Sequence, residues 1–127
     1  MSGVVSQSQV KSFSEILSEV RERVEIECFE KRERAVAEEL CLIIAEVEWL
    51  PSEAVARIGG NDLPAAYVSE IYRRIDNGRL AAVIFKYSEA RYPIKHKKTY
   101  LRTALYNEVF EHESGELNDF NTSFGGF

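Results

Sequence analysis

The chain has 127 residues, of which 45% are hydrophobic and 29% are charged, and its formal net charge is −5. This length indicates a single domain that can bury a core without a metal or a disulfide. Its acidity argues against a protein that coats DNA with its whole surface, and the absence of a long apolar run or a signal-like start predicts a cytoplasmic protein with no membrane partner.

Composition divides the chain into three parts. Residues 1–9 are small and polar and are expected to be a flexible N-terminus, whereas 10–112 carry the pattern of a single helical domain. Residues 113–127 are acidic, contain phenylalanines and are rich in glycine and asparagine. We expect this last part to be a disordered tail, because it is too polar to fold alone.

The first two helices are predicted from apolar residues that recur every three or four positions. Such a stripe runs from Val10 to Val24 and predicts the first helix. The charged stretch 25–34 either continues this helix or holds a break near Cys28. The next helix is apolar on most faces, so it is expected to lie centrally, and Pro51 should end it at the preceding residue.

A strong turn signal follows. Gly59 and Gly60 suit positive φ angles, which leaves open a very short β-hairpin near 55–63. We expect Asp62 to cap the following helix and Pro64 to lie in its first turn.

Three further helices complete the predicted domain. Apolar residues at helical spacing place them over 68–75, 80–87 and 98–110. The predicted fold class is therefore all-α: a compact bundle of about five helices with a flexible C-terminal tail.

Residues typical of enzymes and metal sites are sparse. Cys28 and Cys41 are expected to be reduced, part-buried thiols, and His96 and His112 have no metal-ligand spacing. The glutamates are expected on outer helix faces, with no buried pair to act as acid and base. We therefore predict no catalytic residues, no metal and no cofactor.

Charge is concentrated in one place. The basic island, residues 84–106, contains six Lys and Arg side chains and a single Glu. Tyrosines 87, 92 and 100 are interleaved with these cations, a composition that can stack unpaired bases while the cations hold phosphates. A solvated helix face is the alternative interpretation. The candidate binding residues are Lys86, Arg91, Lys95, Lys97, Lys98 and Arg102.

Two segments carry a more specific signal. The first reads Arg57-Ile-Gly-Gly-Asn-Asp-Leu-Pro-Ala65, and the second contains Tyr100-Leu101 followed by Leu105-Tyr106-Asn107. Their order resembles the helical C-terminal domain of replication initiator A proteins of plasmids and integrative elements in Gram-positive bacteria. That domain is in turn similar to the DnaD-type domain of bacterial primosome proteins.

The resemblance implies a function in DNA replication. Tyr100, Leu101 and Leu105 would pack or position the last helix, and the cations at 95, 97, 98 and 102 would lie at a DNA-facing or partner-facing edge. Implied partners are DNA, bound weakly and sensitively to salt, and replisome proteins such as a helicase loader or the primase machinery. The oligomeric state stays open, and so does the question of an excised domain or a free-standing relative.

The rival hypothesis is a protein–protein interaction domain without DNA contact. Here the acidic helices or the phenylalanine tail would hold the partner, and the net negative charge favours this interpretation.

Overall fold

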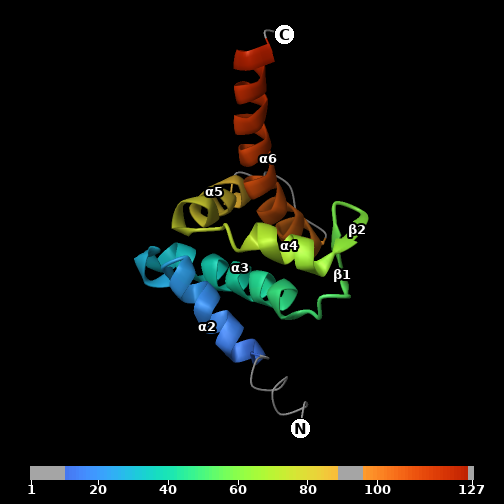
Figure 1. Cartoon of the computed structure of the whole chain (residues 1–127). Coiled ribbons are helices and arrows are strands. Elements are labelled where there is room, and N and C mark those ends of the chain that lie inside the picture. Colours follow the sequence, from blue (N-terminus) through green and yellow to red (C-terminus); the bar gives the residue numbers. More distant parts are fainter. Residues whose placement is uncertain (1–10, 89–95, 126–127) are drawn as a thin grey trace.

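The computed structural model describes residues 11–88 and 96–125, with side chains described only as far as Glu111. In these ranges it holds five α-helices, one short 3₁₀ helix and a two-stranded antiparallel sheet, which confirms the predicted helical bundle. Helix α3 (Lys31–Trp49) is central and contacts α2, α4, α5 and α6 (Figure 1). No helix in the described ranges combines the length and apolarity needed to cross a membrane.

Helix α2 (Phe13–Arg23) starts at a capping box. The Ser12 side chain accepts from the backbone N–H of Glu15, and the Glu15 carboxylate accepts from the backbone N–H of Ser12. The helix ends before Glu25, which has a left-handed φ of 52°, and the 3₁₀ helix η1 (Ile26–Cys28) follows. Of the two alternatives for the stretch 25–34, the break near Cys28 is therefore confirmed.

Helix α3 matches its prediction. It ends at Trp49, and Leu50 is already extended in front of Pro51. Its central place is visible in the residues that it buries, namely Ala37, Leu40, Cys41, Ile43, Ile44, Ala45 and Val47.

The two cysteines differ from the expectation of two part-buried thiols. Both are free, but Cys28 is exposed and Cys41 is fully buried. Burial, aided by the nearby Glu38 carboxylate, raises the pKa of the Cys41 thiol to about 12. Cys41 is therefore a neutral core residue, whereas Cys28 is an exposed side chain at the end of η1.

The predicted short hairpin is present. Strands β1 (Val55–Ile58) and β2 (Asn61–Pro64) pair antiparallel, and the two residues between them are Gly59, with φ of 57°, and Gly60, with φ of 86°. Both glycines thus occupy the left-handed backbone region that side chains disfavour, as the sequence predicted.

The expected cap of the following helix is wrong. Asp62 lies in β2, where it pairs with Arg57 across the hairpin at 3.0 Å. Helix α4 (Ala65–Tyr72) begins one residue after Pro64, which is the last strand residue and the N-cap. The hairpin therefore runs directly into α4, because Asp62 belongs to the antiparallel ladder opposite Arg57 and lies before the start of the helix.

The last two helices are α5 (Asn77–Ser88) and α6 (Lys97–Gly125). The C-terminal end predicted for α6, near residue 110, is wrong. The helical backbone continues to Gly125 and extends beyond the other helices (Figure 1). Residues 111–124 contain no proline and a single glycine, so nothing in them terminates a helix strongly.

Candidate functional site

The structure divides the described part of the basic island between two helices. Lys86 lies in the last turns of α5, and Lys97, Lys98 and Arg102 lie in the first turns of α6. The candidate residues Arg91 and Lys95, with Tyr92, fall outside the described residues. Each of the four described cations lies beside a glutamate.

Three of these cations face helix α3. The Lys97 ammonium lies 3.0 Å from the Glu39 carboxylate, the Lys98 ammonium lies 2.7 Å from Glu46, and the Arg102 guanidinium lies 3.7 Å from Glu46. The hydrogen bond that Lys97 donates to the Glu39 carboxylate raises the pKa of Lys97. The side chains of Lys97 and Lys98 keep 45% and 59% of their surface exposed, so these pairs lie in water, where an ion pair contributes at most about 1 kcal/mol.

The fourth cation pairs with a buried glutamate. The Lys86 ammonium lies 2.9 Å from Glu108, whose side chain is 3% exposed, and this hydrogen bond raises the pKa of Lys86. Glu48 of α3 is likewise buried and pairs with Arg23. The expectation that the glutamates lie on outer faces is therefore wrong at two positions, where a cation from a neighbouring helix compensates for burial.

Two tyrosines of the basic island lie together between α5 and α6. The ring centroids of Tyr87 and Tyr100 are 6.3 Å apart, and the Lys97 ammonium lies 5.5 Å from the centre of the Tyr87 ring. Tyr87 packs partly against the core, whereas Tyr100 is 39% exposed. Tyr100 is thus a half-exposed ring next to Tyr87. Its neighbour Leu101, and not Tyr100, is the residue that packs α6 into the core.

A shallow hollow of about 210 Å³ adjoins Tyr100. Lys86 of α5 and Asn107 of α6 line it as well, together with Glu108, which pairs with Lys86, and Glu111. The structure thus brings a cation of the basic island next to two residues of the second motif. We call Lys86, Tyr87, Lys97 and Tyr100 the α5–α6 surface. A planar group can stack on Tyr100 there while an anionic group approaches the ammonium groups.

The two motifs that carry the family resemblance contact each other. The backbone N–H of Gly59, at the hairpin tip, donates to the Thr103 hydroxyl at 2.9 Å. Leu101 and Leu105 are fully buried, which agrees with the packing role that the resemblance implies for them. The hairpin and the start of α6 therefore form one packed unit.

A second link to α6 comes from α4. The Tyr72 hydroxyl donates to the carbonyl oxygen of Arg102 at 2.6 Å, and burial raises the pKa of this phenol. Sequence reasoning counted Tyr72 as an apolar position of a helix and assigned no role to Thr103. Neither hydrogen bond could be found from spacing, because each joins residues far apart in the chain.

Sequence analysis also missed a row of aromatic side chains on α4 and α6. Tyr106 and Phe110 stack with centroids 5.5 Å apart, Tyr67 lies 6.3 Å from Tyr106, and the two hydroxyls are 3.4 Å apart. Tyr67 and Phe110 are exposed. We call these three residues the aromatic row; the spacing of four between Tyr106 and Phe110 was the available signal.

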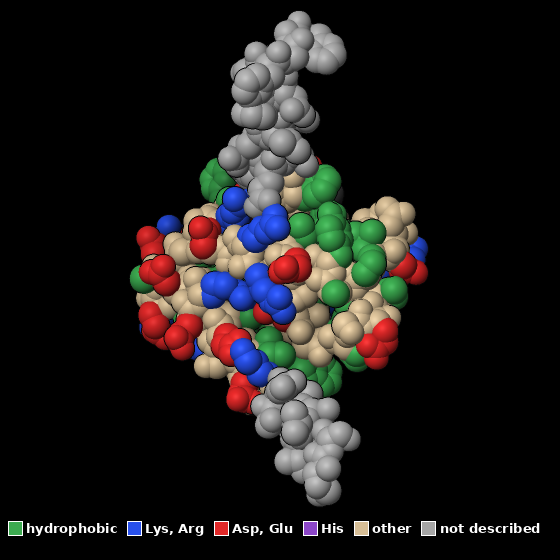
Figure 2. All heavy atoms as spheres, viewed as in Figure 1, with side chains coloured by type: hydrophobic (Ala, Val, Ile, Leu, Met, Phe, Trp, Pro, Cys, Tyr) green, Lys and Arg blue, Asp and Glu red, His purple; other side chains and the backbone are tan. Residues whose placement is uncertain are grey.

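Figure 2 shows hydrophobic side chains gathered toward the right of the face drawn, over the start of α4 and the adjoining part of α6. On the same face, Lys and Arg side chains lie among Asp and Glu side chains and do not form one continuous basic area.

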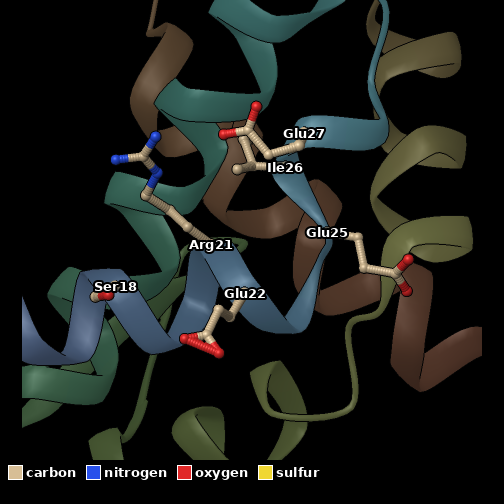
Figure 3. Close-up of a pocket in the computed structure, with 6 residues that line it drawn as sticks. All are labelled: Ser18, Arg21, Glu22, Glu25, Ile26 and Glu27. Atoms are coloured by element: carbon tan, nitrogen blue, oxygen red, sulfur yellow. The ribbon is translucent and has the colours of Figure 1, made fainter.

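A larger hollow, of about 330 Å³, lies at the end of α2. Glu22, Glu25 and Glu27 line it, but their carboxylates point in different directions (Figure 3). Among the described residues, no three acidic, histidine or cysteine side chains are grouped to hold a metal ion. This hollow therefore offers no converging ligands.

Comparisons with known proteins find nothing similar. No family model matches the chain, and neither the curated proteins nor the solved structures contain a match.

Proposed function

We propose that this chain is a non-enzymatic accessory module of bacterial DNA replication that binds single-stranded DNA weakly at the α5–α6 surface. The observation that carries the proposal is the position of Tyr100, a half-exposed ring with Tyr87 beside it and Lys86 lining the same hollow. Exposed aromatic rings with neighbouring cations are typical of single-strand binding.

The arrangement supports binding in two ways. An unpaired base that stacks on Tyr100 contributes about 1–3 kcal/mol whatever its sequence. The adjacent phosphates can reach the ammonium groups of Lys86, Lys97 and Lys98, which are about half exposed. Because these contacts release counterions from the DNA, the affinity should fall steeply as salt rises.

A place in replication is supported by the two motifs of the resemblance. They lie in the hairpin and in α6, and the contact between Gly59 and Thr103 joins them. By the same resemblance we propose that the module works in the bacterial cytoplasm, on a plasmid or an integrative element, together with replisome proteins.

The test is fluorescence anisotropy with single-stranded and duplex oligonucleotides at low and at physiological salt. Tyr100→Ala should weaken single-strand binding about tenfold, because it removes the stacking surface. Tyr67→Ala is the matched control, since it removes a tyrosine of similar exposure from α4, where its ring lies beside Tyr106 and not beside Tyr100. If Tyr100→Ala binds as tightly as the wild type, the α5–α6 surface is not the binding site.

A second candidate function is docking of a replisome protein without DNA contact, and the aromatic row favours it. Stacked, exposed aromatic rings are the side chains that dominate binding energy in protein interfaces. This docking site differs from the acidic helices and the phenylalanine tail that the sequence suggested for the rival hypothesis; the side chains of that tail lie outside the described residues.

This second candidate makes a separate prediction. Wild type should bind no DNA even at low salt, yet should bind a purified helicase loader with an affinity that Phe110→Ala lowers at least tenfold. Phe85→Ala, which removes an exposed phenylalanine from α5, is the control and should bind the loader normally.

A further inference from the structure

Two glutamates of α3 form ion pairs with the cations that would bind phosphates. Glu39 and Glu46 are seven residues apart on α3 and lie against the first turns of α6. Glu39 pairs with Lys97, and Glu46 pairs with both Lys98 and Arg102. A phosphate that approaches any of these cations therefore meets a carboxylate that is already bound.

This competition affects the two forms of DNA differently. Duplex DNA has its bases paired inside, so its sequence-independent binding rests on phosphate contacts, and its charge density exceeds that of a single strand. The competing carboxylates therefore weaken the phosphate contacts, on which duplex binding mainly depends. Stacking of an unpaired base on Tyr100 involves no phosphate, so Glu39 and Glu46, which pair with Lys97, Lys98 and Arg102, do not compete with it.

We infer that Glu39 and Glu46 are specificity-determining residues, which make the surface at the start of α6 prefer single-stranded over duplex DNA by competing with phosphates for Lys97, Lys98 and Arg102. The inference rests on the proposed binding of single-stranded DNA. It adds that the preference is set by two carboxylates on a helix outside the basic island.

The test compares wild type with Glu39→Gln/Glu46→Gln on a single-stranded oligonucleotide and on the matching duplex. The matched control is Glu30→Gln/Glu70→Gln, which removes the same charge from two other exposed ion pairs, Glu30 with Arg32 and Glu70 with Arg73. Thermal unfolding verifies that each variant is folded. Glu39→Gln alone, which frees only Lys97, is the fallback if the double variant unfolds.

We expect the double variant to bind the duplex about tenfold more tightly than wild type and the single strand only about threefold more tightly. Its duplex affinity should also depend more steeply on salt, because more phosphates are neutralised. The control should change both affinities equally and by less than about twofold.

Two outcomes would overturn the inference, and they are distinguishable from failure of the proposed function. If wild type binds the single strand but the double variant does not tighten duplex binding beyond the control, the glutamates do not set the preference. If both affinities rise by the same factor, the glutamates only contribute net charge. If wild type binds neither DNA, the proposed function itself is wrong.

Discussion

Helix α3 carries ion pairs on two sides, and the two sides differ in burial. Toward α2, Glu48 pairs with Arg23, and the two side chains are 7% and 26% exposed. Toward α6, Glu46 pairs with Lys98, and these side chains are 40% and 59% exposed. The same kinds of charge therefore form a largely buried ion pair on the α2 side and a solvent-exposed ion pair on the α6 side.

The difference shows which pairs can exchange partners. Burial raises the pKa of Glu48 even though the Arg23 guanidinium and, more weakly, Arg73 oppose the shift, so this carboxylate depends mainly on its pairing with Arg23. A solvated pair such as Lys98 with Glu46 contributes little to stability, so the protein loses little stability when an external anion replaces the carboxylate. The α2 side is therefore structural, and the α6 side is available for binding.

The largest expected effect comes from breaking the buried pair. Arg23→Gln leaves Glu48 without its cation and should lower the free energy of unfolding by about 2 kcal/mol at pH 7, discounted for the partial exposure of Arg23. The folded-state pKa of Glu48 lies above its ordinary value of 4.5, so stability should be recovered as pH falls from 7 toward 5 and the carboxyl takes up a proton. Urea unfolding at both pH values measures this.

Arg21→Gln is the control for that experiment. It breaks the pair with Glu38, whose side chain is more exposed, and should cost less than about 1 kcal/mol. An equal loss for the two arginine variants would contradict the distinction between the buried and the exposed pairs.

An intermediate effect is expected at the uncharged link between α6 and the hairpin. Thr103→Val removes the acceptor for the Gly59 N–H and should lower the free energy of unfolding by about 1 kcal/mol, independently of salt. Thr99→Val makes the same change at an exposed position of α6 and should cost less. Chemical denaturation at two salt concentrations separates this hydrogen bond from the ion pairs.

The smallest effect on stability is expected for the lysines at the start of α6, although their replacement should weaken DNA binding strongly. Lys97→Gln/Lys98→Gln should change the free energy of unfolding by less than about 1 kcal/mol, because both pairs are solvated. Single-strand affinity at low salt should nevertheless fall about tenfold, and the slope of log affinity against log salt should shrink by about 0.7 for each lost phosphate contact. Neutral glutamine avoids adding repulsion toward Glu39 and Glu46.

The matched control for this variant is Lys11→Gln/Lys31→Gln, which removes two exposed lysines, one just before α2 and one at the start of α3. It should reduce DNA affinity by less than about twofold. A loss of stability of 2 kcal/mol or more in the α6 variant would show that its pairs are structural after all.

Local chemistry explains where prediction from the sequence succeeded. The end of α3 before Pro51 follows from the restriction that proline places on the preceding residue, and the turn at Gly59 and Gly60 follows from their tolerance of positive φ. Buried Leu101 and Leu105 follow from apolar spacing. Prediction failed at Asp62, because its place in a strand depends on antiparallel pairing with β1 across the hairpin.

The sequence supplied the candidate residues of the site, but it did not supply their electrostatic partners. The sequence by itself determined an all-α bundle, a basic island with interleaved tyrosines, and two motifs, since these depend on residue type and short-range spacing. Only the tertiary structure decided that Glu39 and Glu46 lie on the cations of α6, that Tyr100 is half exposed, and that three aromatic rings form a row. The physical reason is that charge pairing and exposure depend on which helix faces meet, and helices brought together from distant parts of the chain leave no mark in local spacing.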